Sequence, residues 1–120
     1  MVTTPQTTLA QFLAQPETKP DREYFDYHIA PKPLPQGQHS LLQGRLVAFI
    51  NERVLPQQLA YALPELRCTF NGVSIVPDIA VFTWARIPRN EQGKIANRFT
   101  THPNWVIEIL SPEQSANQLI

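Results

Sequence analysis

Two short apolar segments of this 120-residue chain each carry one carboxylate among branched aliphatic residues. Asp78 lies in VPDIAVF, residues 76–82, and Glu108 lies in WVIEIL, residues 105–110. Burying an ionised carboxylate without a partner costs several kcal/mol. Two carboxylates held close together also repel each other unless a cation lies between them. The pair is therefore a candidate cation site.

The cation that such a pair favours is a hard divalent ion, Mg²⁺ or Mn²⁺. Mg²⁺ takes oxygen ligands, commonly one or two carboxylates with water and phosphate in the other positions. The backbone carbonyl of Ile109 is a further candidate ligand. An ion held in this way activates water and stabilises charge on a phosphate. A structural role is the alternative, in which each acid pairs with an arginine such as Arg67 or Arg86.

Strands must position these two acids. Residues 73–84 and 104–110 are rich in valine, isoleucine and aromatic residues, which is typical of strands. Successive side chains of a strand alternate between its two faces. If the two strands are neighbours, Asp78 and Glu108 converge on one side of the sheet. Residues 66–70 form a further strand, joined to 73–84 by a hairpin turn at Asn71-Gly72.

The longest predicted helix runs from His39 to about Leu55, with Ser40 as its expected cap. Its apolar stripe consists of Leu42, Leu46, Phe49, Ile50 and Val54. Gln43 and Asn51 fall off this stripe. Upstream of the helix, prolines divide the chain into short pieces.

Those pieces are a short helix over residues 8–14 capped by Thr8, a strand over 22–30 and a loop over 32–37. At the other end, Ser111-Pro112 predicts the start of another helix. The order of elements predicts one α/β domain with a mixed sheet over residues 1–120.

Composition excludes several classes of protein. Zero net charge and a pI near 6.8 argue against a stand-alone nucleic-acid binder with a bulk basic surface. A single cysteine, Cys68, rules out an internal disulfide. The sequence has neither a long apolar run nor a signal-peptide pattern, so we expect no membrane span and a cytoplasmic location.

The segment IVPDIAVF, followed by a charged loop and then WVIEILSPEQS, resembles the Uma-two family of restriction endonucleases. That family belongs to the PD-(D/E)XK nuclease superfamily, which has the restriction-endonuclease-like fold. KPLPQGQHSLLQG, residues 32–44, is similar to the loop and helix start of the family, and the resemblance covers most of residues 17–120. The predicted helix and three strands are similar to the first part of the superfamily core.

The resemblance implies a Mg²⁺-dependent endonuclease that acts on DNA, with Asp78 and Glu108 as metal ligands and Glu108 also orienting water. The superfamily lysine normally stands two residues after the second acid, where this chain has Leu110. Family members carry a lysine further on, after the Ser-Pro dipeptide, but no lysine follows Lys94 here. We therefore find no catalytic lysine and expect a truncated domain, with the second core helix and last strand missing or incomplete.

Several other residues are weaker candidates for a role in the site. His39 is either a phosphate or proton contact or a polar residue at a helix start, and Glu23 either extends the acidic site or is solvated. Residues 26–28 depart from the acid-Gly-Glu-like stretch of many family members. The bases of the loop over residues 86–98 either contact a DNA backbone or are solvated.

Two functions follow from the sequence. The first is a metal-dependent DNA endonuclease, inactive if truncation has removed its lysine. The alternative is a non-catalytic oligomerising or DNA-associated module derived from such a nuclease. A missing second helix would uncover one apolar sheet face, so we expect a homodimer through that face.

Overall fold

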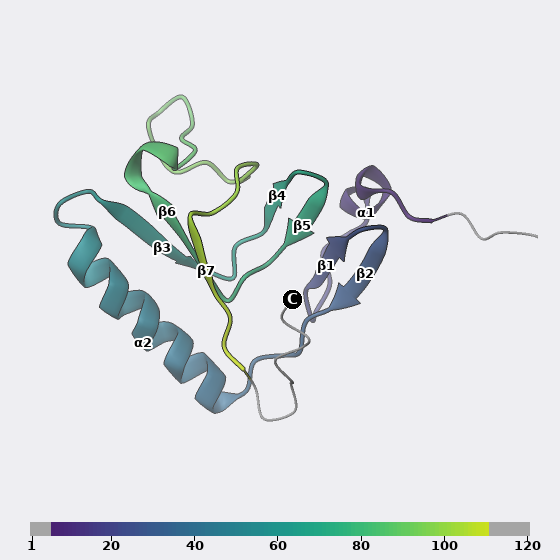
Figure 1. Ribbon diagram of the computed structural model, residues 1–120, viewed down its shortest axis with the longest axis horizontal. Coiled ribbons are helices and arrows are strands. Elements are labelled where there is room, and N and C mark those ends of the chain that lie inside the picture. Colours follow the sequence, from purple (N-terminus) through teal and green to yellow (C-terminus); the bar gives the residue numbers. More distant parts are fainter. Residues whose placement is uncertain (1–5, 111–120) are drawn as a thin grey trace, which may run out of the picture.

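Local sequence signals set the bounds of the helices and strands in the computed structural model, which describes residues 6–110 (Figure 1). In chain order the elements are α1 (Leu9–Ala14), β1 (Arg22–Phe25), β2 (His28–Pro31), α2 (Gly37–Val54), β3 (Ala60–Pro64), β4 (Cys68–Phe70), β5 (Val73–Ile75), β6 (Ile79–Thr83), the 3₁₀ helix η1 (Trp84–Arg86) and β7 (Trp105–Ile107). The helix expected at Ser111 lies outside the described residues. Among residues 6–110, no helix combines the length and apolar character needed to cross a membrane.

Two sheets meet at the segment that carries Asp78. One sheet has the strand order β2-β1-β5-β4 and the other has the order β3-β6-β7. The strand predicted over residues 73–84 is wrong as a single unit, because β5 ends at Ile75 and β6 begins at Ile79. Pro77 has no N–H to donate to a ladder, so it favours a break there. Asp78 therefore lies at the crossing from one sheet to the other.

Hairpin turns explain a second difference from expectation. Residues 22–30 form two strands rather than one, with Asp26 and Tyr27 at φ 50° and 63° in the turn between β1 and β2. Left-handed backbone is uncommon outside glycine and more frequent at aspartate than at tyrosine, so the sequence carries only a weak turn signal. The hairpin predicted at Asn71-Gly72 is confirmed, with φ values of 47° and 81°.

The prediction for α1 is confirmed, whereas the prediction for α2 is partly wrong. The Thr8 cap of α1 is confirmed, because Thr8 and Gln11 form a reciprocal capping box. The Ser40 cap of α2 is wrong, since the helix begins at Gly37 after Gln36. Its apolar stripe is partly wrong as well: Leu42 and Phe49 are 47% and 54% exposed. Polar residues of α2 face the sheet in their place.

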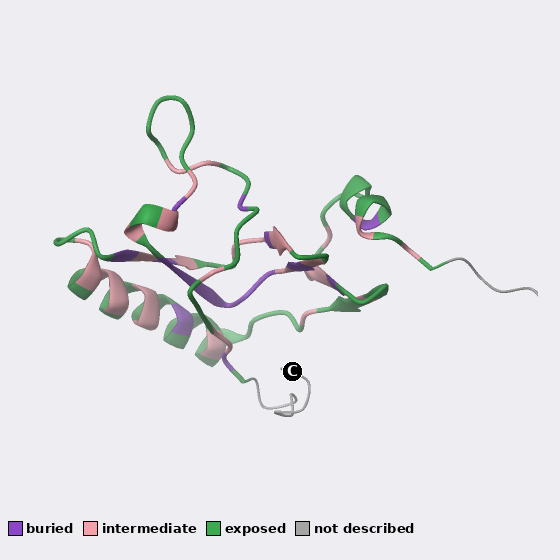
Figure 2. Ribbon diagram, turned by 45° about the horizontal axis from the view of Figure 1, so that its top comes forward, coloured by how far each residue is buried: buried purple, intermediate pink, exposed green. Residues whose placement is uncertain are grey.

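Strand β6 forms the centre of the structure and is buried on both faces (Figure 2). Ile79 and Val81 belong to a cluster packed against α2, through Leu46, Val47, Ile50 and Val54. Ala80 and Phe82 pack on the other side, with Cys68, Ile87 and Phe99. Strand β3, which the sequence reasoning missed, pairs with β6 along its whole length.

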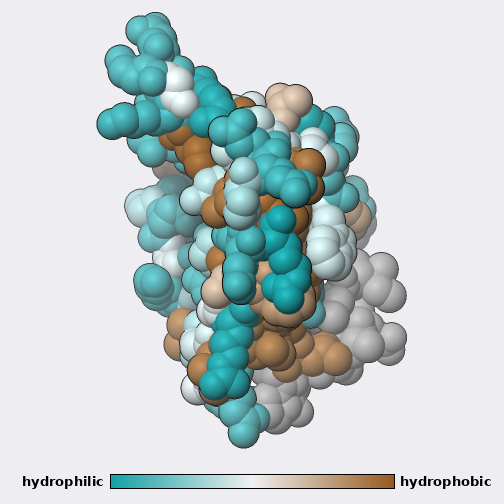
Figure 3. Space-filling view, turned by 90° about the vertical axis from the view of Figure 1, so that its left-hand side faces the viewer, coloured by the Kyte–Doolittle hydropathy of each residue, from teal (hydrophilic) through white to brown (hydrophobic). Residues whose placement is uncertain are grey.

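The uncovered sheet face that we expected is therefore not found on β6. Large exposed apolar side chains lie instead on α2 and at β7: Leu41, Leu42, Phe49, Trp105 and Val106. Figure 3 views the α2 side of the molecule, where apolar surface gathers toward the lower part and polar residues cover the top. The chain thus covers the middle of this sheet by itself and leaves apolar surface at its margins.

Asn51 joins α2 to the edge of the sheet. Its side-chain amide donates to the Ala62 carbonyl at 2.9 Å and accepts from the Ala62 N–H at 2.8 Å. Ala62 lies on the edge strand β3 and is 1% exposed. Both backbone groups would otherwise be buried without partners.

We predict that Asn51→Ala lowers the free energy of unfolding by about 1–3 kcal/mol, the cost of leaving a buried donor or acceptor unpaired. Urea unfolding measures this change. Asn97→Ala, at an exposed position, is the matched control and should leave stability nearly unchanged. Equal stability of the two variants would contradict the role of Asn51.

Candidate active site

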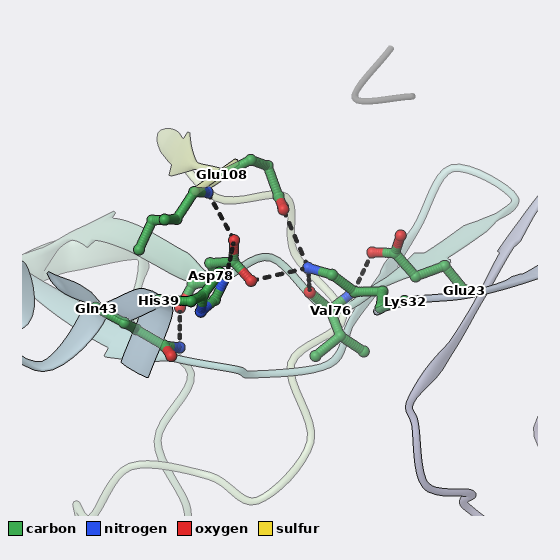
Figure 4. A network of polar contacts seen from close by, with 8 residues as sticks. Glu23, Lys32, His39, Gln43, Val76, Asp78 and Glu108 are labelled. Carbon is green, nitrogen blue, oxygen red and sulfur yellow. Dashed lines mark hydrogen bonds and ion pairs between the residues drawn. The ribbon is translucent and has the colours of Figure 1, made fainter. Parts of the chain in front are cut away.

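The pairing of β6 with β7 brings the two acids together. The antiparallel register joins Ile79 to Ile107 and Ala80 to Val106. Continued by one residue, it sets Asp78 opposite Glu108, just beyond the ends of both strands. The two carboxylates lie close enough to bind the same cationic group (Figure 4).

That group is the ammonium of Lys32. Its Nζ lies 3.2 Å from Asp78 Oδ1, 3.0 Å from Glu108 Oε2 and 2.6 Å from the carbonyl oxygen of Val76. The side chain of Lys32 is only 15% exposed. No lysine follows Glu108 in the sequence, whereas the fold brings Lys32 to the acids from the loop between β2 and α2.

The backbone around Lys32 is restrained. Its N–H donates to the Asp21 carbonyl at 2.8 Å. Pro31 and Pro33 flank it, and proline limits both its own φ and the conformation of the preceding residue. The loop therefore holds the Lys32 backbone in place while its side chain reaches the acids.

Asp78 is fixed by three other elements. Its Oδ2 accepts a hydrogen bond from the Ile109 N–H at 2.7 Å and lies 3.2 Å from His39 Nε2. The Asp78 carbonyl accepts from Gln43 Nε2 at 2.8 Å and from the Glu65 N–H at 3.1 Å. Ile109 thus contacts Asp78 through its amide, and a ligand role for its carbonyl stays a prediction.

These contacts shift the ionisation of all three groups. Burial raises the pKa of Asp78, but the Ile109 hydrogen bond and the Lys32 ammonium outweigh it, and the pKa lies below its ordinary value. For Glu108, burial outweighs the Lys32 ammonium and the pKa is raised. Burial lowers the pKa of Lys32, but the carboxylates of Glu108 and Asp78 outweigh burial and raise it. The lysine is therefore charged at neutral pH.

The other predicted residues take varied positions. His39 joins the site through Asp78, and its Nδ1 is buried without a hydrogen-bond partner among residues 6–110. Glu23 accepts from the Val76 N–H at 2.8 Å and so supports the segment that carries the acids. The proposed arginine partners are wrong: Arg67 pairs with Glu17, and Arg86 bonds to residues 102 and 104.

The basic loop lies beyond the other end of β6, away from Asp78 (Figure 1). Arg89 lies over the Trp84 ring at 4.9 Å and donates to the Gly93 carbonyl. Arg86 and Arg89 thus have internal partners, whereas Lys94 and Arg98 are exposed.

Lys32 and Gln43 are the two site residues that sequence reasoning missed. Gln43 is 6% exposed on the inner face of α2, although its side chain is polar. The one available signal was their position within residues 32–44, the segment that resembles the family. The residue types in that segment do not indicate which side chains point toward the acids.

A cleft of about 280 Å³ opens beside Asp78 and Lys32. Its lining includes the lysines Lys19 and Lys32, the acids Asp21, Glu65 and Asp78, and His39. The loop prolines Pro33 and Pro35 form part of its wall. Lys32 therefore lies at the boundary between the acid pair and an open space.

The residues present suit a hard cation in one respect and fall short in another. Three oxygen atoms, from two carboxylates and one carbonyl, already surround a single positive charge. Within residues 6–110, however, no group of three or more His, Cys, Asp and Glu side chains is close enough to hold a metal ion. A divalent ion here would take carbonyl, water or phosphate oxygens as its remaining ligands.

Known proteins resemble this chain in sequence and in fold. The family model "Uma2: Putative restriction endonuclease" matches residues 9–120. A crystal structure of a "putative nuclease belonging to DUF820" from Anabaena variabilis superposes with a TM-score of 0.89 at 54% sequence identity. The match covers 93% of this chain and 63% of that one, so this chain spans less than two thirds of the solved nuclease. No curated protein matches the chain.

The chain therefore belongs to the Uma2 family, and its mixed α/β architecture is a restriction-endonuclease-like, nuclease-type fold. Resemblance at the level of sequence had implied both conclusions, and both are confirmed.

Because the pKa values of Asp78 and Glu108 shift in opposite directions, removing each carboxylate should change the stability at low pH in opposite ways. Ionised Asp78 contributes stability that is complete above its unfolded pKa, about 3.9, and is lost as pH falls through its lower folded pKa. Asp78→Asn should therefore reduce the acid-induced loss of unfolding free energy. Glu108 has a raised folded pKa, so its protonation in acid favours the folded state, and Glu108→Gln should steepen the loss.

Urea unfolding between about pH 5 and about pH 2 measures both effects. Asp26→Asn is the control, because it removes an exposed carboxylate at a positive φ that asparagine also adopts. If Asp78→Asn and the unsubstituted chain lose the same unfolding free energy between about pH 5 and about pH 2, the lowered pKa of Asp78 is contradicted.

Proposed function

We propose that this chain is a metal-dependent DNA nuclease in which Asp78 and Glu108 bind Mg²⁺ or Mn²⁺. The observation that carries the proposal is the convergence of both carboxylates and the Val76 carbonyl on one cationic position. Membership of a family described as restriction endonucleases supports the same chemistry. The activity of the whole protein is part of the proposal, since the solved relative is longer.

Asp78, Glu108 and the Val76 carbonyl would hold the ion. When bound, such an ion supplies a water of lowered pKa and neutralises charge on a phosphodiester. Asp78 suits the role of a permanent ligand, because its pKa is low and three partners fix its carboxylate. Glu108 suits the role of proton acceptor through the carboxylate oxygen that does not hold the ion, because its raised pKa makes it the stronger base of the two.

The cleft positions the substrate in this proposal. Lys19, Lys32 and His39 line it and provide positive charge or hydrogen-bond donors for a phosphate. The formal net charge of the chain is zero, so affinity for DNA must come from such local groups. The exposed Lys94 and Arg98 are the additional candidates at a distance from the acids.

A non-catalytic DNA-associated or oligomerising module is the second candidate. The observation that favours it is the ion pairing of both acids with Lys32, which gives the two carboxylates a partner within the chain. The apolar surface at β7, where Trp105 is 57% exposed, is the place where a homodimer would form. The non-catalytic role and the homodimer both remain predictions.

We predict that the chain nicks supercoiled plasmid DNA in the presence of Mn²⁺ or Mg²⁺ and not in EDTA. Asp78→Asn and Glu108→Gln should each reduce the rate by about a hundredfold or more, because each removes a charge placed at the reacting centre. Gel separation of supercoiled and nicked plasmid follows the reaction.

Glu91→Gln, in the exposed distant loop, should cleave like the unsubstituted chain and is the matched control. Retention of metal-dependent nicking in Asp78→Asn would refute the proposed site. DNA binding without cleavage under every metal condition would instead favour the non-catalytic module.

A further inference from the structure

The position of Lys32 has a consequence for how metal enters the site. Its Nζ lies between 2.6 and 3.2 Å from three oxygens that a hard cation would use. Mg²⁺ binds oxygen at about 2.0–2.1 Å, so an ion bound to the same atoms would occupy nearly the same point. Two cations cannot share that point, because of both steric overlap and charge repulsion.

The surroundings allow the ammonium to move while the backbone stays in place. The Lys32 N–H is bound to the Asp21 carbonyl, and prolines stand on both sides of it. The side chain has four rotatable bonds and borders the open cleft. Asp21 and Glu65 also line this cleft and offer carboxylates to a displaced ammonium.

We propose that Lys32 is an internal counter-ion, which a divalent metal ion displaces from between Asp78 and Glu108 into the adjoining cleft. This inference rests on the proposed metal-dependent function and adds a means of regulation to it. Before metal binds, the lysine pairs with both acids, lowers the repulsion between them and holds the junction of the two sheets together. After displacement, the same ammonium faces the space that would receive a substrate phosphate.

Two effects follow for a variant that lacks the ammonium. Without metal, Asp78 and Glu108 would face each other with no positive charge between them, so the fold would lose stability. With metal, no ion pair would have to be broken on binding, so affinity for the metal would rise. Stability and affinity therefore change in opposite directions, which a merely structural lysine would not produce.

The test is isothermal titration calorimetry with Mn²⁺ alone, at one fixed pH, on the unsubstituted chain, Lys32→Met and Lys32→Arg. We expect Lys32→Met to bind Mn²⁺ about tenfold more tightly, a coupling of ordinary size between two competing ligands. Lys32→Arg keeps a competing charge and should stay near the unsubstituted chain. Arg45→Met removes an exposed positive charge of α2 that lies outside the cleft, and should leave the affinity for Mn²⁺ unchanged.

Thermal unfolding in EDTA and in Mn²⁺ provides the second readout. Lys32→Met should unfold at a lower temperature than the unsubstituted chain in EDTA and gain more from Mn²⁺. Should Lys32→Met fail to fold, the unsubstituted chain with ¹³C-labelled lysine keeps the proposal testable. Its Lys32 Cε resonance, assigned by comparison with Lys32→Arg, should shift when Mg²⁺ is added while that of Lys94, in the distant loop, stays fixed.

Each outcome decides between the proposals. Equal or weaker Mn²⁺ affinity of Lys32→Met, or an unmoved Cε resonance at saturating Mg²⁺, would overturn displacement and leave the metal site intact. Absence of Mn²⁺ binding by every variant would overturn the metal proposal and the competition together. Tighter Mn²⁺ binding by Lys32→Met, together with no DNA cleavage by the unsubstituted chain, would support displacement and refute the nuclease.

Discussion

The rest of this structure depends on an ion pair between one lysine and two carboxylates, of which Asp78 is buried and Glu108 is half-buried. Asp78 stands where the chain leaves one sheet and enters the other, and Glu108 stands at the end of β7. Lys32 reaches both acids from the loop that precedes α2. Loss of its charge would leave two acids confined at the junction of the sheets, with Asp78 only 5% exposed.

The packing around this pair explains why the acids are held so firmly. The centre of β6 is buried on both faces, which fixes the direction in which the chain enters the site. Helix α2 adds Gln43 and His39, whose side chains contact the backbone and the carboxylate of Asp78. The site is therefore assembled on rigid elements before any ligand binds, as preorganised catalysis requires.

Sequence reasoning predicted those parts of the fold that local signals determine. The Thr8 cap, the Asn71-Gly72 hairpin and the two apolar segments with their acids were all legible from residue type and spacing. The division of residues 73–84 between two sheets was not, because one proline is the only local sign of it and both halves are apolar. Lys32 was missed because its partners lie 46 and 76 positions away, and only the tertiary fold brings them together.

A crystal structure of the chain grown with Mn²⁺ would test the central claim most directly, because manganese is visible by its anomalous scattering. Our account predicts a manganese peak between Asp78 and Glu108, with the Lys32 ammonium moved into the cleft. Crystals with Mn²⁺ in excess in which Nζ still bridges the two carboxylates, and no manganese lies beside them, would contradict it.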